Sequence, residues 1–214
     1  MIRQSSRTRL LAAALSMLAG YVDAVGFIEL GGLFVSFMSG NSTRLATGIV
    51  DGSGAALTAA TLVLLFVLGV VAGTLLGRTV PRWRRPAILI LVAALLAGAA
   101  ALDRHGLFAA AIAAAVLAMG AENTVFERDG EVQVGLTYMT GTLVKLGQRI
   151  AATLLGGERW GWMPYLLLWL GLVVGAVLGA AVHPWLGLGS LWIAAAAALV
   201  LAIPAAWREP ARSA

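Results

Sequence analysis

The sequence contains no cysteine and few charged side chains. Asp, Glu, Lys and Arg together make up 12% of its 214 residues, and only two histidines are present. The absence of cysteine excludes disulfides, thiol catalysis and cysteine-ligated metals. His105 and His183 stand at expected helix ends without a nearby acidic cluster, so we expect neither a metal nor another cofactor. With 60% hydrophobic residues, the chain has too little polar surface to cover a soluble globule of its size, which points to a membrane.

Long apolar runs are the main feature that the sequence does contain. They fall near residues 10–28, 57–77, 87–102, 107–125, 163–182 and 188–206. Each run approaches the roughly 20 residues with which a helix crosses the hydrocarbon core. We therefore expect an all-α polytopic membrane protein with six transmembrane helices, in contact with the lipid bilayer. The formal charge of +5 comes from bases in short loops beside the runs, which favours membrane topology over nucleic-acid binding.

The N-terminus imitates a cleaved signal peptide, because Arg3, Arg7 and Arg9 precede an apolar run with small residues near its end. An internal repeat argues against cleavage. "GYVDAVGF" (20–27) aligns with "GAENTVF" (120–126), and "LGVVAGTLLG" (68–77) aligns with "LGLVVGAVLG" (170–179). The first segment is therefore expected to be one member of a pair. We expect a single membrane domain, 1–214, built from homologous halves at about 8–103 and 106–207.

The basic residues predict the orientation of the helices. They gather before the first apolar run, in "RTVPRWRR" (78–85), and in the tail at Arg208 and Arg212. Short basic loops are normally cytoplasmic. All three groups share one side only if residues 31–50 enter and leave the membrane on one face. Each half then has three spans, so the second half runs inverted relative to the first, as in many transporters, and both termini are cytoplasmic.

The same turn occurs twice, in "LFVSFMSGNSTRLATG" (33–48) and "VGLTYMTGTLVKLGQR" (134–149). In each copy an extended stretch meets Gly40 or Gly141, which permits a tight turn, and Ser39 or Asn41 can cap a following helix. A helix from about Asn41 to Val50 would measure about 15 Å, half a hydrocarbon core. Its partner would run from Thr140 or Gly141 to about Leu155. We expect two re-entrant half-helices whose positive ends lie deep in the membrane and suit an anion.

Two sets of candidate site residues follow from the repeat. Arg44 and Lys145 are the equivalent bases after the turns; they could contact a solute, snorkel, or pair with Asp23 and Glu122. Those carboxylates could couple protons, or they could pair with or cap the adjacent turns. The substrate or pathway candidates are Ser39, Gly40, Asn41, Arg44, Tyr138, Thr140, Gly141, Thr142 and Lys145, and the coupling or ion-pair candidates are Asp23, Glu122 and Asn123. The Gly69/Gly73/Gly77 and Gly171/Gly175/Gly179 ladders are expected to be helix contacts.

The stretches "GYVDAVGFIELGGLFVSFMSGN" and "VGLTYMTGTLVKLG" resemble the two signatures of the YoaK-like family of bacterial inner-membrane proteins, of the UPF0700 type, with domain of unknown function 1275. The resemblance covers nearly the whole chain. Ser39 stands where Thr is usual, and Glu122 stands where the commoner form has Gln. The resemblance implies the fold described above and a location in the bacterial inner membrane, but it implies no activity.

The expected function is transport of a small solute that is anionic or carries a carboxylate, with proton coupling as an option. A passive pore between two opposed half-helices stays open, and so does a structural or regulatory protein without flux. An enzyme is not expected. A hydrolase would need Ser39 and His183 as nucleophile and base, yet the equivalent position, Thr140, has no matching histidine. A homo-oligomer is also compatible with the sequence.

Overall fold

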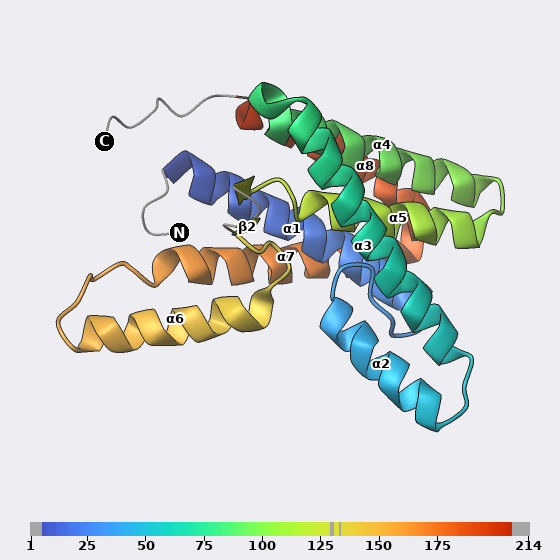
Figure 1. Cartoon of the computed structure of the whole chain (residues 1–214), viewed down its shortest axis with the longest axis horizontal. Helices are drawn as coiled ribbons and strands as arrows, with labels where there is room; N and C mark the ends of the chain where they lie inside the picture. The colour runs from blue at the N-terminus through green and yellow to red at the C-terminus, as the bar shows by residue number, and fades with distance from the viewer. Residues whose placement is uncertain (1–5, 129–130, 133, 207–214) are drawn as a thin grey trace.

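The computed structural model describes residues 6–128, 131–132 and 134–206. Apolar helices form most of this part of the chain (Figure 1). The elements are α1 (Ser6–Glu29), α2 (Met38–Val50), α3 (Ala55–Thr79), the 3-10 turn η1 (Pro81–Trp83), α4 (Arg84–Arg104), α5 (Phe108–Glu122), β1 (Glu127–Arg128), β2 (Glu131–Val132), α6 (Met139–Leu154), α7 (Met163–Leu186), η2 (Gly187–Ser190) and α8 (Leu191–Ala205).

The expected class of a polytopic helical membrane protein agrees with this structure. Helices lie over all six apolar runs, and four helical stretches are long and apolar enough to cross a membrane; the last of them, Met163–Ala205, contains both α7 and α8. The apolar helix α5 is shorter, at 15 residues. Six separate crossings therefore remain a prediction. Within this helical structure, the two-residue strands β1 and β2 pair antiparallel, Glu127 with Val132 and Arg128 with Glu131.

Glycine stops both of the short helices, α2 and α6. Gly52 and Gly156 follow them with φ of 64° and 86°, a conformation that glycine adopts without strain. The next amide in each case reaches back to the helix, as Ser53 N–H donates to Gly48 O at 3.0 Å and Gly157 N–H to Ala152 O at 2.8 Å. These are the bonds of a Schellman cap. The first helix therefore ends at Val50, as expected, and the second ends at Leu154, next to its expected end at about Leu155.

Close helix contacts join the two expected halves of the chain. A Cβ atom added to Gly175 of α7 would overlap Met17 O of α1, and one added to Gly69 of α3 would overlap Leu117 O of α5. Small residues allow such backbone approach, which gives van der Waals packing between apolar helices. The remaining ladder glycines behave alike: Gly171 and Gly179 face α1, Gly73 faces α5, and Gly77 faces Arg84. The glycine ladders are thus helix contacts, as expected.

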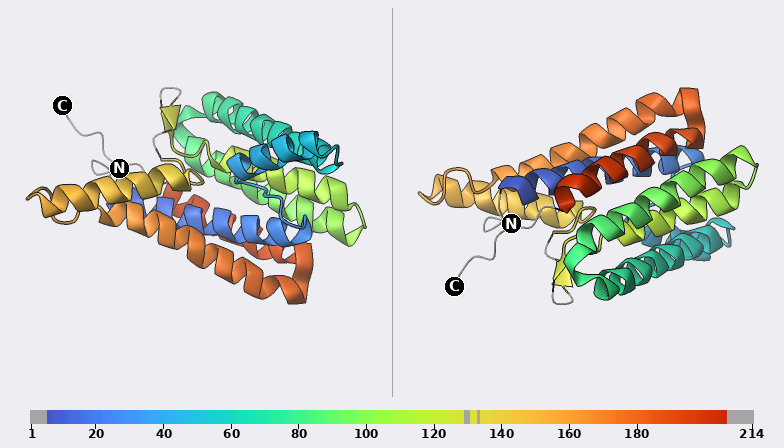
Figure 2. Two further views of the ribbon diagram at one scale, coloured as in Figure 1. Left: turned by 90° about the horizontal axis from the view of Figure 1, so that it is seen from below. Right: turned by 90° about the horizontal axis from the view of Figure 1, so that it is seen from above.

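The short helices lie at opposite ends of the bundle, α6 beside the start of α7 and α2 beside the start of α3 (Figures 1 and 2). The start of α1, the turn between α3 and α4, and the end of α8 share the end at which α6 projects (Figure 2). One ion pair also joins the expected halves near each end: Arg84 and Glu127 approach to 2.6 Å, and His183 and Glu29 to 2.8 Å.

Candidate functional site

The two duplicated turns meet around one cavity. It has a volume of about 290 Å³. Its wall consists almost entirely of residues that the repeat aligns: Ser36 with Thr137, Phe37 with Tyr138, Met38 with Met139, and Ser39 with Thr140, together with Gly141 and Phe66. Two stretches that lie about a hundred residues apart in the sequence thus form a single site.

The starts of α2 and α6 form part of this wall. α2 begins at Met38, not at Asn41 as expected, and α6 begins at Met139. Neither start has a side-chain cap, so the expectation that Ser39 or Asn41 caps the first helix is wrong. The first amides of a helix have no acceptor within it. The cavity therefore adjoins two helix N-termini, each with the positive end of a helix dipole.

Asn41 binds the backbone of the extended stretch before α2. Its Oδ1 accepts the Phe34 amide at 2.9 Å, and its Nδ2 donates to Phe34 O at 2.7 Å. The side chain is completely buried. Asn41 thus satisfies both polar groups of one backbone residue, much as a neighbouring β-strand would. This contact explains why Asn41 is unavailable as a cap. Thr142, its counterpart in the repeat, is also buried.

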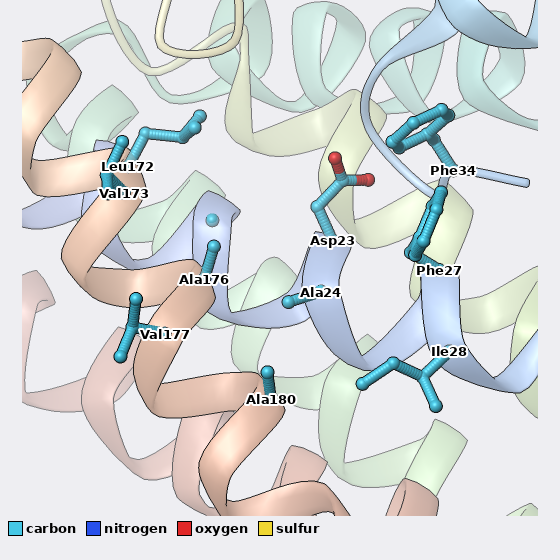
Figure 3. A pocket seen from close by; sticks show the side chains of 11 residues that line it. Asp23, Ala24, Phe27, Ile28, Phe34, Leu172, Val173, Ala176, Val177 and Ala180 are labelled. Carbon is cyan, nitrogen blue, oxygen red and sulfur yellow. The ribbon is translucent and has the colours of Figure 1, made fainter. Parts of the chain in front are cut away.

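Asp23 and Asn123, which the repeat aligns, each hold one extended stretch. Asp23 Oδ1 accepts the amides of Val35 at 2.9 Å and Ser36 at 2.8 Å. In Figure 3 its carboxylate points from α1 toward the stretch that carries Phe34. Asn123 Oδ1 accepts the Thr137 hydroxyl at 3.1 Å. Of the roles considered for Asp23, capping of the turn is therefore the one that these contacts support.

Glu122 contrasts with its neighbour Asn123. Its side chain is 0% exposed, and neither carboxyl oxygen has a hydrogen-bond partner. The ion pair considered between this carboxylate and Lys145 is therefore not formed. Arg44 and Asp23 form no ion pair either within residues 6–128, 131–132 and 134–206.

Arg44 and Lys145 do not line the cavity, and both are exposed. The Arg44 guanidinium packs against Gly32, where a Cβ atom would lie 2.7 Å from its Nη2. Because each helix starts at a methionine, these bases lie six residues into it, about 9 Å along the axis from the start. At this distance from the helix starts, Arg44 and Lys145 lie outside the cavity wall, in which the sequence analysis had expected them.

The two turn glycines are not equivalent. A Cβ atom on Gly40 would lie 2.8 Å from the rings of Phe34 and Phe37, whereas one on Gly141 would meet no atom within 4 Å. Neither glycine has a positive φ, so the tight turn expected at these positions is absent. Gly40 is required for space, and Gly141 contributes to the cavity wall.

Six cavity residues are not among the candidates that the sequence supplied. Ser36, Thr137, Phe37 and the two methionines that begin α2 and α6 lie in the wall, and Phe66 of α3 completes it. The repeat alignment could have identified the first two, since it places one hydroxyl opposite the other, just before the aromatic pair. Phe66 has no comparable signal, because it is one apolar residue in a long apolar helix.

A second hollow, of about 530 Å³, lies between α1 and α7. Figure 3 shows its lining, in which Asp23 is the only charged side chain among Ala24, Phe27, Val177 and other apolar residues. Since the Asp23 carboxylate already binds two backbone amides, it is engaged in holding the turn.

Comparison with known proteins agrees with the motifs. A model of the family described as protein of unknown function (DUF1275) matches residues 11–204. The chain belongs to this DUF1275 family. The UPF0700 transmembrane protein RA0705 of Rhizobium meliloti (strain 1021) is similar, with 38% identity over 212 residues, which is 97% of this chain and 92% of the relative. No solved structure matches the chain. The resemblance seen in the sequence is thus confirmed, and the transmembrane relative together with the apolar helices supports a membrane protein.

Proposed function

We propose that this protein transports a small anion, such as a halide or a short carboxylate, through the cavity between the duplicated turns. One observation carries the proposal: two helix starts and five hydroxyl-bearing residues converge on a cavity of about 290 Å³ whose wall contains no charged side chain. Ligand pockets usually begin at about 300 Å³, so a solute of few atoms fits best.

Neutral donors suit the transport of an anion. Hydroxyl groups stabilise negative charge, as do the positive ends of two helix dipoles. Binding must nevertheless stay weak enough for release, and a buried lysine or arginine would hold the anion more firmly. Arg44 and Lys145 therefore act outside the binding cavity in this proposal, which revises the role first considered for them.

The proposal includes an inverted-repeat arrangement with six crossings in the bacterial inner membrane. Three observations support it: α1 packs on α7 while α5 packs on α3, α2 and α6 lie at opposite ends of the bundle (Figure 2), and the turn with the basic segment 78–85 shares one end with the start of α1 and the end of α8. In this arrangement both short helices are re-entrant and that shared end is cytoplasmic.

A passive pore is the second candidate, and the neutral cavity wall favours it. A pore and a transporter differ in kinetics. A transporter saturates and shows counterflow, in which an outward gradient of unlabelled solute drives inward movement of labelled solute. A pore shows neither effect at moderate concentrations.

Flux into liposomes that contain the purified protein tests the proposal. Chloride, fluoride, formate and acetate serve as probes, each with and without a pH gradient. We expect saturable flux of at least one anion, counterflow, and loss of flux in the double variant Ser39→Ala/Thr140→Val. Thr61→Val is the matched control, because Thr61 lies on the exposed surface of α3 and donates to Leu57 O. Absence of flux for all four anions would contradict the proposal, and flux without counterflow would assign the protein as a pore.

A further inference from the structure

Glu122 is a buried carboxyl group without a hydrogen-bond partner in the part of the chain that the structure describes. It is the last residue of α5, its side chain is 0% exposed, and both of its oxygens lack a hydrogen-bond partner. An ionised carboxylate in such surroundings is far more costly than a neutral carboxylic acid. Ionisable groups within membrane helices are rare and commonly take part in proton relays. Unsatisfied groups of this kind call for an explanation.

Charged groups on the helices around α5 do not supply that partner. α5 packs against α1, α3 and α4. The titratable side chains on these helices are Arg7, Arg9, Tyr21, Asp23 and Glu29 on α1, Arg78 on α3, and Arg84, Arg85, Asp103 and Arg104 on α4. None of them bonds to the Glu122 oxygens.

Three of these side chains have other contacts. Arg84 binds Glu127 and donates to Thr124 O at 3.3 Å, and Arg85 lies over the ring of Phe126 at 5.2 Å. Asp23 accepts two backbone amides. Glu122 is thus the carboxyl group near the cavity that the scaffold does not use.

Two contacts connect this part of α5 to the cavity wall. The next residue, Asn123, accepts the hydroxyl of Thr137 at 3.1 Å, and Thr137 lines the cavity. On the other side of Glu122, Gly120 lies against Phe66 O, and Phe66 lines the cavity as well. These contacts join the cavity wall to residues one and two positions from Glu122.

We propose that Glu122 is a proton-binding site coupled to the solute cavity, so that this protein moves its anion together with a proton. This inference rests on the proposed function. An anion in the cavity favours the protonated acid over the carboxylate, since two negative charges repel across a medium of low dielectric constant. Linkage is reciprocal, so proton binding favours the anion to the same extent. Asp23 has no such role, because its carboxylate holds the first turn.

Infrared spectroscopy tests the proton-binding site without any transport assay. Protein with isotope-labelled glutamate, in liposomes, should show a protonated carboxyl band near neutral pH that titrates reversibly. The band should be lost in Glu122→Gln and kept in the control Glu158→Gln, which changes an exposed glutamate. The isotope shift assigns the band to a glutamate. If Glu122→Gln folds poorly, Glu122→Asp keeps a carboxyl group at the site and should remove the isotope shift from the band. Absence of a labelled band, or a band that does not titrate, would overturn the inference.

Flux measurements test the coupling with whichever of chloride, fluoride, formate and acetate the wild-type protein moves. An inward proton gradient should drive accumulation of that anion. Glu122→Gln should lose this drive while keeping exchange of anion for anion, and Glu158→Gln should keep both. Wild-type flux that ignores the pH gradient would overturn the coupling and leave the proposed function intact. Absence of flux for all four anions would remove the proposed function and the coupling together, while the infrared result would still decide whether Glu122 binds a proton.

Discussion

Single polar residues around the cavity act mainly on the backbone that forms it. Asn41 holds Phe34, Asp23 holds the amides of residues 35 and 36, and Asn123 holds Thr137. Extended backbone inside an apolar interior has no sheet to satisfy its polar groups, so Asn41 and Asp23 supply the hydrogen bonds that a neighbouring strand would supply. Asn123 instead binds the side chain of Thr137. These residues define the shape of the site without lining it.

Replacing Asn41 by alanine should therefore destabilise the fold. The change removes two hydrogen bonds and leaves the amide and carbonyl of Phe34 unsatisfied, and each buried unsatisfied group typically costs about 1–3 kcal/mol. Thermal unfolding in detergent measures the effect. Ser42→Ala is the matched control, because Ser42 is exposed one residue further along and bonds only Met38 O of its own helix. Equal stability of the two variants would show that the Asn41 contacts contribute nothing.

The residues of the site were predictable from the repeat, but the role of the bases was not. Ser39, Tyr138, Thr140 and Gly141 lie in the cavity wall because the duplicated motif marks the turns directly. The position of Arg44 relative to the cavity depends on where α2 begins. Cap preferences predicted that α2 begins at about Asn41. The Asn41 side chain instead bonds to the backbone of Phe34, and the helix begins at Met38. The contact between Asn41 and Phe34, which cap preferences do not describe, thus determines where α2 begins.

Whole helices in this protein associate through backbone contact. Gly20 of α1 faces Leu172 O of α7, and Gly175 of α7 faces Met17 O of α1. Apolar helices in lipid gain little from a hydrophobic driving force, so such close packing supplies much of their association. The pairing of α1 with α7 therefore depends on residues without side chains.

Gly175→Ala should weaken the pairing of α1 and α7. The added methyl group has no room against the Met17 carbonyl, and overpacking typically costs about 1–3 kcal/mol. The melting temperature in detergent should fall. Gly98→Ala is the control, since a Cβ atom at that position of α4 meets nothing within 4 Å, and it should not lower the melting temperature. A melting temperature unchanged by Gly175→Ala would contradict the packing described above.

The positions of the apolar helices could be predicted from composition, whereas the short strands β1 and β2 could not. All six apolar runs are covered by helices, because runs of this length and hydropathy have few alternatives in a membrane. The hairpin at Glu127–Val132 escaped prediction, since "ERDGE" contains too few strand-forming residues to distinguish a two-residue pairing from a solvated turn.

The molecule as a whole has a basic end. The start of α1, the turn between α3 and α4, and the end of α8 lie together (Figure 2), and the segments next to them carry most of the clustered arginines. The repeat and the charge distribution predicted this grouping. They could not predict which side chains close the cavity, because that depends on packing between the halves.

Single-cysteine labelling tests the orientation, since the chain contains no cysteine. A cysteine at Trp83, in the turn between α3 and α4, should resist a membrane-impermeant thiol reagent in intact cells and react after the cells are opened. A cysteine at Ser53, between α2 and α3, should react in intact cells, because the positive-inside rule places the opposite end outside. External labelling at position 83 would reverse the orientation and remove the argument for the inverted repeat.

Chemical block of the cavity tests the central claim most directly. Ser39→Cys places one thiol in the cavity wall, and Thr61→Cys places one on the exposed surface of α3. Anion flux into liposomes is measured before and after reaction with a small thiol reagent, with the extent of modification determined by mass spectrometry. We predict that modification at position 39 stops the flux, that the transported anion slows this modification, and that modification at position 61 changes neither. Undiminished flux through fully modified Ser39→Cys protein would contradict transport through this cavity.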